Sequence, residues 1–67
     1  MVNTGLLEEA ISRSGLKKGY IAAQIGLTRA GLRNCITNRA EFKASQMLRL
    51  CDLLGLSNEQ AKAIFSP

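Results

Sequence analysis

The side chains best suited to chemistry in this chain are two cysteines, Cys35 and Cys51. The sequence has no histidine and no CxxC pair, so it cannot supply the sets of cysteine and histidine ligands that hold zinc. Two cysteines allow one disulfide, far below the density of a secreted mini-protein. Both lie within apolar helical patterns, where a free cysteine packs as a small hydrophobic group. We therefore expect reduced thiols in a cytoplasmic protein.

No group of residues has the pattern of a catalytic site. Without histidine, an imidazole-based triad and a histidine-bound metal centre are both excluded. The remaining residues offer no pairing of a nucleophile with a base. We expect no enzymatic activity, no metal, no cofactor and no small-molecule ligand.

Positive charge is concentrated in the middle of the chain, whose net charge is +4. Residues 17–43 carry six basic side chains and one acidic side chain, a balance of +5. Residues 1–16 have a balance of −1, and residues 44–67 are neutral. Such a stretch is typical of a protein that binds a polyanion, although a solvated basic face would give the same count.

Length and composition indicate one small folded domain over residues 1–67. Apolar residues make up 46% of the chain and charged residues 21%, as in folded rather than disordered proteins. No segment approaches the roughly 20 apolar residues of a membrane span. The first four residues lack the basic region that begins a signal peptide, so we expect neither a leader nor a membrane anchor.

Helical periodicity recurs along the chain and predicts five short helices. The first follows Asn3 or Thr4 as N-cap and stops at Gly15, and the next three cover about 18–25, 29–37 and 45–54. Ser57 opens the last helix as the N-cap of a capping box. The polar segment 38–43 is expected to be a loop anchored by Phe42.

The second and third expected helices are separated by a very short turn. Only Gly26 and Leu27 stand before Thr28, the expected N-cap of the third helix. So short a turn makes two helices cross steeply, as in a helix-turn-helix. That motif also needs a small residue, a residue tolerant of positive φ and several apolar residues at fixed offsets. The matching residues are Ala22, Gly26, Leu27, Leu32 and Ile36.

Residues 18–32, KGYIAAQIGLTRAGL, resemble the helix-turn-helix of phage repressor and Cro proteins. The runs NRAEFKAS (38–45) and LCDLLGLS (50–57) resemble the loop and fourth helix of the same family, and the similarity extends over about 6–65. The chain is most similar to the small Cro-like proteins of Gram-positive phages and prophages. The resemblance implies an all-α fold, a compact five-helix lambda-repressor-like domain with the helix-turn-helix formed by helices two and three. Lys18 departs from the pattern, since many relatives carry Gln there.

In this family the second helix of the motif lies in the major groove of DNA. With the apolar stripe facing the core, the resemblance implies base contacts by the outward residues Arg29, Ala30, Arg33 and Asn34. Arginine can pair with guanine, asparagine with adenine and alanine with the thymine methyl group, while Arg33 has phosphate contact as an alternative. The candidate phosphate contacts are Lys18, Thr28, Thr37, Asn38, Arg39 and Lys43.

Two further residues of the motif leave alternatives open. Tyr20 is expected to pack over the first helix, with a phosphate contact as the other interpretation. Gly31 is unusual because glycine inside a helix costs roughly 1 kcal/mol relative to alanine. Gly31 indicates either that the DNA backbone or the neighbouring helix approaches the α-helical backbone closely at this position, or that a chance change to glycine is tolerated there.

A surplus of apolar residues in the last two helices indicates a dimer interface. A core stripe on the fourth helix takes Met47 or Leu48 together with Cys51 and Leu54, which leaves other leucines on a flank. The expected interface residues are Leu50, Leu53, Ile64 and Phe65. In the alternative, the fifth helix covers this flank and no interface is left. A two-fold dimer would require a pseudo-palindromic operator.

These observations lead us to expect a sequence-specific DNA-binding regulator of transcription, derived from a phage or prophage. The resemblance implies a Cro-like or repressor-like protein that occupies double-stranded operator DNA as a homodimer and excludes polymerase, and the sequence leaves the sign of regulation open. Its location would be the cytoplasm of a bacterial or phage-infected cell. The alternatives are an antitoxin, although no segment is left over to bind a toxin, and a protein-interaction module that uses the apolar surface of the last two helices.

Overall fold

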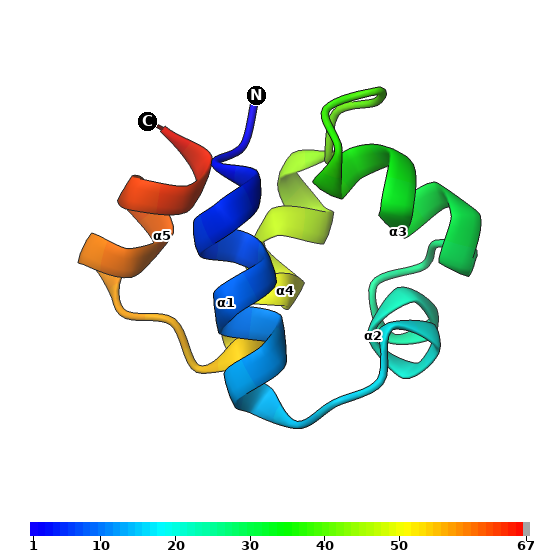
Figure 1. Ribbon diagram of the computed structural model, residues 1–67, viewed down its shortest axis with the longest axis horizontal. Helices are drawn as coiled ribbons and strands as arrows, with labels where there is room; N and C mark the ends of the chain where they lie inside the picture. Colours follow the sequence, from blue (N-terminus) through cyan, green and yellow to red (C-terminus); the bar gives the residue numbers. More distant parts are fainter. Residues whose placement is uncertain (67) are drawn as a thin grey trace.

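Five helices form the regular structure of residues 1–66, the part of the chain that the computed structural model describes. They are α1 (Thr4–Ser14), α2 (Lys18–Gln24), α3 (Arg29–Ile36), α4 (Ala44–Leu54) and α5 (Asn58–Phe65). In Figure 1, α1 runs down the middle of the molecule, with α5 on one side of it and α2 and α3 on the other. The expected all-α fold is confirmed. None of the helices within residues 1–66 combines the length and apolar character needed to cross a membrane.

Side-chain caps begin three of the helices, α1, α3 and α5. Asn3 Oδ1 accepts a hydrogen bond from the Leu6 N–H at 3.1 Å, and Thr28 Oγ1 accepts one from the Gly31 N–H at 3.0 Å. Ser57 is the N-cap of the expected capping box, because its N–H donates a hydrogen bond to Gln60 Oε1 at 2.8 Å. The prediction differs by one residue at the ends of α2 and α3 and at the start of α4.

Every helix contributes to a single apolar core. Its buried members are Leu7, Ile11, Ile21, Ala22, Ile25, Leu32, Cys35, Ile36, Phe42, Leu50 and Ile64. Phe42 is buried as expected, and its ring meets that of Phe65 edge to face, with 5.9 Å between ring centroids. This aromatic contact joins the loop after α3 to the end of α5.

The buried side of α4 differs from the prediction. Leu50, expected on a partly exposed flank, is 0% exposed. Of the two alternatives for the core stripe, Met47 packs against the core and Leu48 is 70% exposed. Ile64 is also buried, and Leu53 and Phe65 are partly buried against the core. The helix carries apolar residues around most of its circumference, so its own periodicity does not decide which side faces α1 and α2. Leu50 and Ile64 are therefore core residues, and their assignment to an exposed dimer surface is wrong.

Both cysteines are free. Cys35 is buried in the core, and burial raises the pKa of its thiol. Burial also raises the pKa of the partly buried Cys51, and the neighbouring Asp52 carboxylate adds to this effect against an opposing backbone hydrogen bond. Both thiols are consequently protonated and poorly nucleophilic at neutral pH.

Candidate nucleic-acid interface

A tight turn, residues 25–28, joins α2 to α3. Gly26 adopts the left-handed conformation with φ of 79°, and the Leu27 N–H donates to the Ala22 carbonyl oxygen at 2.8 Å. Ala22 is buried where the two helices meet, so a larger side chain would push them apart. Figure 1 shows α2 almost end-on while α3 runs across the view, so the two axes cross steeply. Gly26 therefore has the positive φ that was expected of it, and Ala22 is buried as expected.

The α3 helix has one buried face and one exposed face. Leu32, Cys35 and Ile36 are buried, which ties the helix to the core. The four residues expected to point outward are all exposed: Arg29, Ala30, Arg33 and Asn34. At helical spacing, these four form one surface, with two guanidinium groups and one amide on it.

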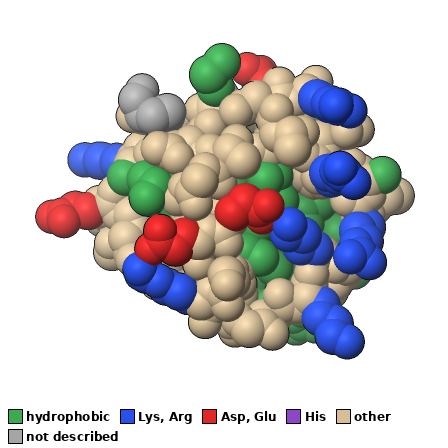
Figure 2. Space-filling model, viewed as in Figure 1, with side chains coloured by type: hydrophobic (Ala, Val, Ile, Leu, Met, Phe, Trp, Pro, Cys, Tyr) green, Lys and Arg blue, Asp and Glu red, His purple; other side chains and the backbone are tan. Residues whose placement is uncertain are grey.

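Basic side chains outside the ion pairs of residues 1–66 lie on this surface and on the loop that follows α3. Within residues 1–66 there are two ion pairs, Glu9–Arg13 and Glu8–Lys18, and neither involves α3 or the loop that follows it. Arg39 and Lys43, on that loop, are exposed. Most of the Lys and Arg side chains visible in Figure 2 lie on the side of the molecule where Figure 1 places α2 and α3. Residues 17–43, the basic segment of the sequence, thus place their charges on one face of the folded chain (Figure 2).

A hollow of about 540 Å³ runs beside the exposed face of α3. Its lining comes from α1, α2, α3 and the residue after α3, and consists of Glu8, Lys18, Arg29, Ala30, Arg33, Ile36 and Thr37. Five of the residues predicted to contact DNA bases or phosphates therefore line it: Lys18, Arg29, Ala30, Arg33 and Thr37. We call this feature the basic hollow.

Several expected phosphate contacts already have partners within the protein. Thr28 caps α3, and the Thr37 hydroxyl donates to the Arg33 carbonyl oxygen at 2.8 Å. Asn38 adopts φ of 64°, and its amide forms a pair of hydrogen bonds with Val2. Its Oδ1 accepts from the Val2 N–H at 2.8 Å, and its Nδ2 donates to the Val2 carbonyl oxygen at 3.0 Å. The geometry therefore supports a structural role for Asn38 rather than a phosphate contact.

Replacing Asn38 should separate its two structural contributions. Asn38→Ala removes both hydrogen bonds to Val2 and places a Cβ in the left-handed region, and we expect a loss of about 1–3 kcal/mol in the free energy of unfolding. Asn38→Gly removes the hydrogen bonds but relieves the backbone, so its loss should be about half as large. Urea denaturation measures both values. If both variants matched the unaltered chain in stability, the two hydrogen bonds between Asn38 and Val2 would make no contribution to the free energy of unfolding.

Two other residues of this surface carried alternatives from the sequence. Tyr20 is 50% exposed, which is compatible both with packing over the first helix and with a phosphate contact. At Gly31, a Cβ would lie 3.2 Å from Thr28 Oγ1 and 3.5 Å from Leu27 Cδ2. The glycine therefore makes room for the N-cap hydroxyl and for the leucine of the turn.

Two side-chain contacts that hold this surface in place were not predicted from the sequence. The Arg49 Nε on α4 donates to the Gln24 carbonyl oxygen at 2.9 Å, at the C-terminal end of α2. The Thr4 hydroxyl donates to the Ile36 carbonyl oxygen at 2.6 Å, at the end of α3. These pairs are 25 and 32 residues apart in sequence, and no local pattern signals them.

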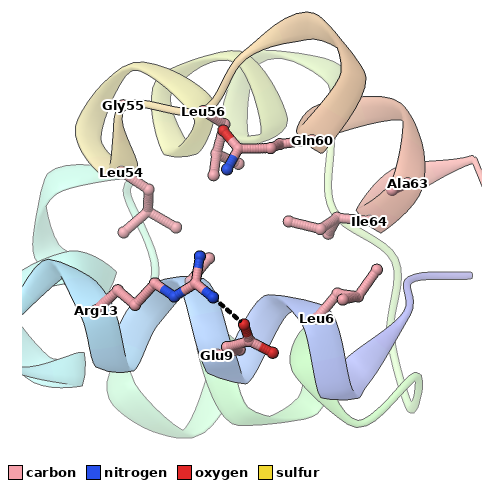
Figure 3. Close-up of a pocket in the computed structure, with 10 residues that line it drawn as sticks. Leu6, Glu9, Arg13, Leu54, Gly55, Leu56, Gln60, Ala63 and Ile64 are labelled. Carbon is pink, nitrogen blue, oxygen red and sulfur yellow. Dashed lines mark hydrogen bonds and ion pairs between the residues drawn. The ribbon is translucent and has the colours of Figure 1, made fainter.

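A second hollow, of about 170 Å³, lies between α1, the end of α4 and α5. Its apolar lining includes Leu6, Leu54, Leu56 and Ile64. Figure 3 shows the Arg13 and Gln60 side chains pointing toward this space from α1 and α5. We call it the apolar hollow. It shares α1 with the basic hollow, whereas α4 and α5 line only the apolar hollow.

Comparison of the chain with protein-family models, with curated proteins and with solved structures finds no match. Its function must therefore be inferred from the geometry of the chain itself.

Proposed function

We propose that this chain is a sequence-specific DNA-binding regulator of transcription that inserts α3 into the major groove of an operator. The observation that carries the proposal is the exposed face of α3, where Arg29, Arg33 and Asn34 lie together without ion pairs to the described residues. A rigid helix with guanidinium and amide groups on its free face has the donors and acceptors that base edges recognise.

The pairing of α2 with α3 supports a helix-turn-helix. Gly26 and the buried Ala22 allow a short turn and close helix contact. In a helix-turn-helix the first helix crosses the DNA backbone while the second enters the groove. Here α2 would lie across the phosphates with Lys18 at its start, and α3 would present its N-terminal residues to the bases.

The two kinds of contact have separate tasks. Arg29 can pair with guanine and Asn34 with adenine, each good pair contributing about 1–3 kcal/mol of discrimination. The exposed Arg39 and Lys43 on the next loop would contact phosphates. Phosphate contacts orient the protein on the duplex but carry no direct sequence information.

We further propose that the chain acts as a homodimer on a pseudo-palindromic operator, as a repressor of the phage or prophage Cro-like type that excludes polymerase. Of the residues first predicted for an interface, Leu53 and Phe65 retain partial exposure and can contribute to one. A two-fold axis would place the two α3 helices in successive major grooves.

Selection of binding sites from a random duplex library, at about physiological salt, tests this function. At that salt concentration sequence-independent binding is weak, so enrichment reports base recognition. We expect an inverted repeat with half-sites about 10 base pairs apart. A single enriched half-site would support the regulator and contradict the dimer. No enrichment would contradict the proposed function.

The apolar hollow favours a second candidate function, that of a protein-interaction module. Ala63 lines this hollow and is exposed, so Ala63→Glu would place a charge in it with little effect on the core. A module of this kind should lose its partner in that variant and keep it when Arg29 and Arg33 are reversed in charge. A DNA-binding regulator should respond in the opposite way.

A further inference from the structure

An ion pair lies within the basic hollow. Lys18 Nζ, at the first residue of α2, lies 2.9 Å from Glu8 Oε1 and 3.1 Å from Glu8 Oε2 on α1. Both side chains are partly exposed, and both line the same hollow as Arg29 and Arg33. The ammonium group is therefore held between two carboxylate oxygens on the surface that carries the positive charge.

Glu8 is the one acidic residue of the chain described in residues 1–66 that lines the basic hollow. A carboxylate here cancels the charge of Lys18 and repels an approaching polyanion. Carboxylate and phosphate oxygens both accept charge-assisted hydrogen bonds from an ammonium group, so they compete for it. Lys18 can bind a phosphate fully only when it leaves Glu8.

We propose that Glu8 is an internal competitor of DNA phosphate for Lys18 and that it limits the sequence-independent part of DNA binding. This inference rests on the proposed function, because it takes the face of α3 as the DNA interface. In the free protein Glu8 neutralises Lys18. In the complex Lys18 moves to a phosphate, and the Glu8 carboxylate, now facing the DNA, opposes association.

The variant Glu8→Gln tests the proposal because it removes the charge and keeps the shape. We expect its affinity for a random-sequence duplex at 50 mM salt to rise about 3–10-fold, as for one added phosphate contact. The slope of log affinity against log salt concentration should become more negative by about 0.9. The gain in affinity over the unaltered chain should therefore shrink about 3.5-fold between 50 and 200 mM salt. The selected operator should gain by the same factor as the random duplex.

Glu9→Gln is the matched control. Glu9 adjoins Glu8 on α1 and also forms an ion pair, but its partner is Arg13 and both line the apolar hollow (Figure 3). The control changes the net charge equally, yet it should leave the salt slope unchanged. Glu8→Asp, which keeps the charge, should retain the unaltered slope. Adding Lys18→Gln to Glu8→Gln should bring the steeper slope back toward that of the unaltered chain.

The outcomes separate the two proposals. If Glu8→Gln matches Glu9→Gln in affinity and slope while the unaltered chain binds its operator, Glu8 is no competitor and the proposed function stands. If the unaltered chain binds no duplex at any salt concentration, both proposals are wrong. Circular dichroism of each variant checks that it folds, and Glu8→Asp supplies a folded comparison that retains the charge.

Discussion

The double variant Arg29→Glu/Arg33→Glu is expected to lose at least about 100-fold in operator affinity while folding as well as the unaltered chain. Each arginine contact with a base or phosphate is worth about 1–3 kcal/mol, and each new carboxylate adds repulsion from the DNA. Both side chains are exposed and have no ion pair within residues 1–66, so the fold does not depend on them. Fluorescence anisotropy with a labelled operator duplex measures the loss.

Long-range charge alone could also weaken DNA binding, and a second double variant controls for it. Arg13→Glu/Lys62→Glu also lowers the formal net charge from +4 to zero, but it alters exposed residues of α1 and α5. We expect a much smaller loss of affinity, which added salt should largely remove. Equal losses in the two double variants would show that α3 makes no direct contacts, and the proposed interface would then be wrong.

The variant Leu50→Ala should produce the largest loss of stability among substitutions on α4. Leu50 is fully buried, and truncating such a leucine costs about 2–5 kcal/mol through lost transfer free energy and a residual cavity. A domain of this size has a total stability of only about 3–10 kcal/mol. We therefore expect a variant that is largely unfolded at 37 °C, as measured by thermal and urea denaturation.

Leu48→Ala provides the matched control, because Leu48 lies on the same helix with its side chain mostly exposed. Its effect should stay within about 0.5 kcal/mol. Similar losses in the two variants would contradict the observed orientation of α4.

The helix ends and the two faces of α3 could be predicted from the sequence because they depend on local interactions. The caps at Asn3, Thr28 and Ser57 bond to groups three residues away. Gly15 and Gly55 end α1 and α4 in the left-handed conformation, which glycine adopts without strain. On α3 the apolar residues occupy one stripe, so only one orientation toward a core is possible.

The orientation of α4 could not be predicted in the same way. Six apolar residues larger than alanine are distributed around this helix: Met47, Leu48, Leu50, Cys51, Leu53 and Leu54. Several orientations would bury a similar apolar area, and α1 and α2 determine which of them packs without a cavity. That packing buries Leu50, exposes Leu48 and changes which residues remain available for a partner.

The contacts that occupy polar side chains of the candidate site also depend on tertiary structure. Asn38 bonds to Val2, Lys18 to Glu8 and Arg49 to Gln24, across 36, 10 and 25 residues of sequence. The sequence by itself determined the five helices, the N-caps of α1, α3 and α5, the basic segment and the outward face of α3. Only the tertiary structure decided which of the basic and polar groups are free to meet a ligand, because packing of the helices brings distant partners within hydrogen-bond distance.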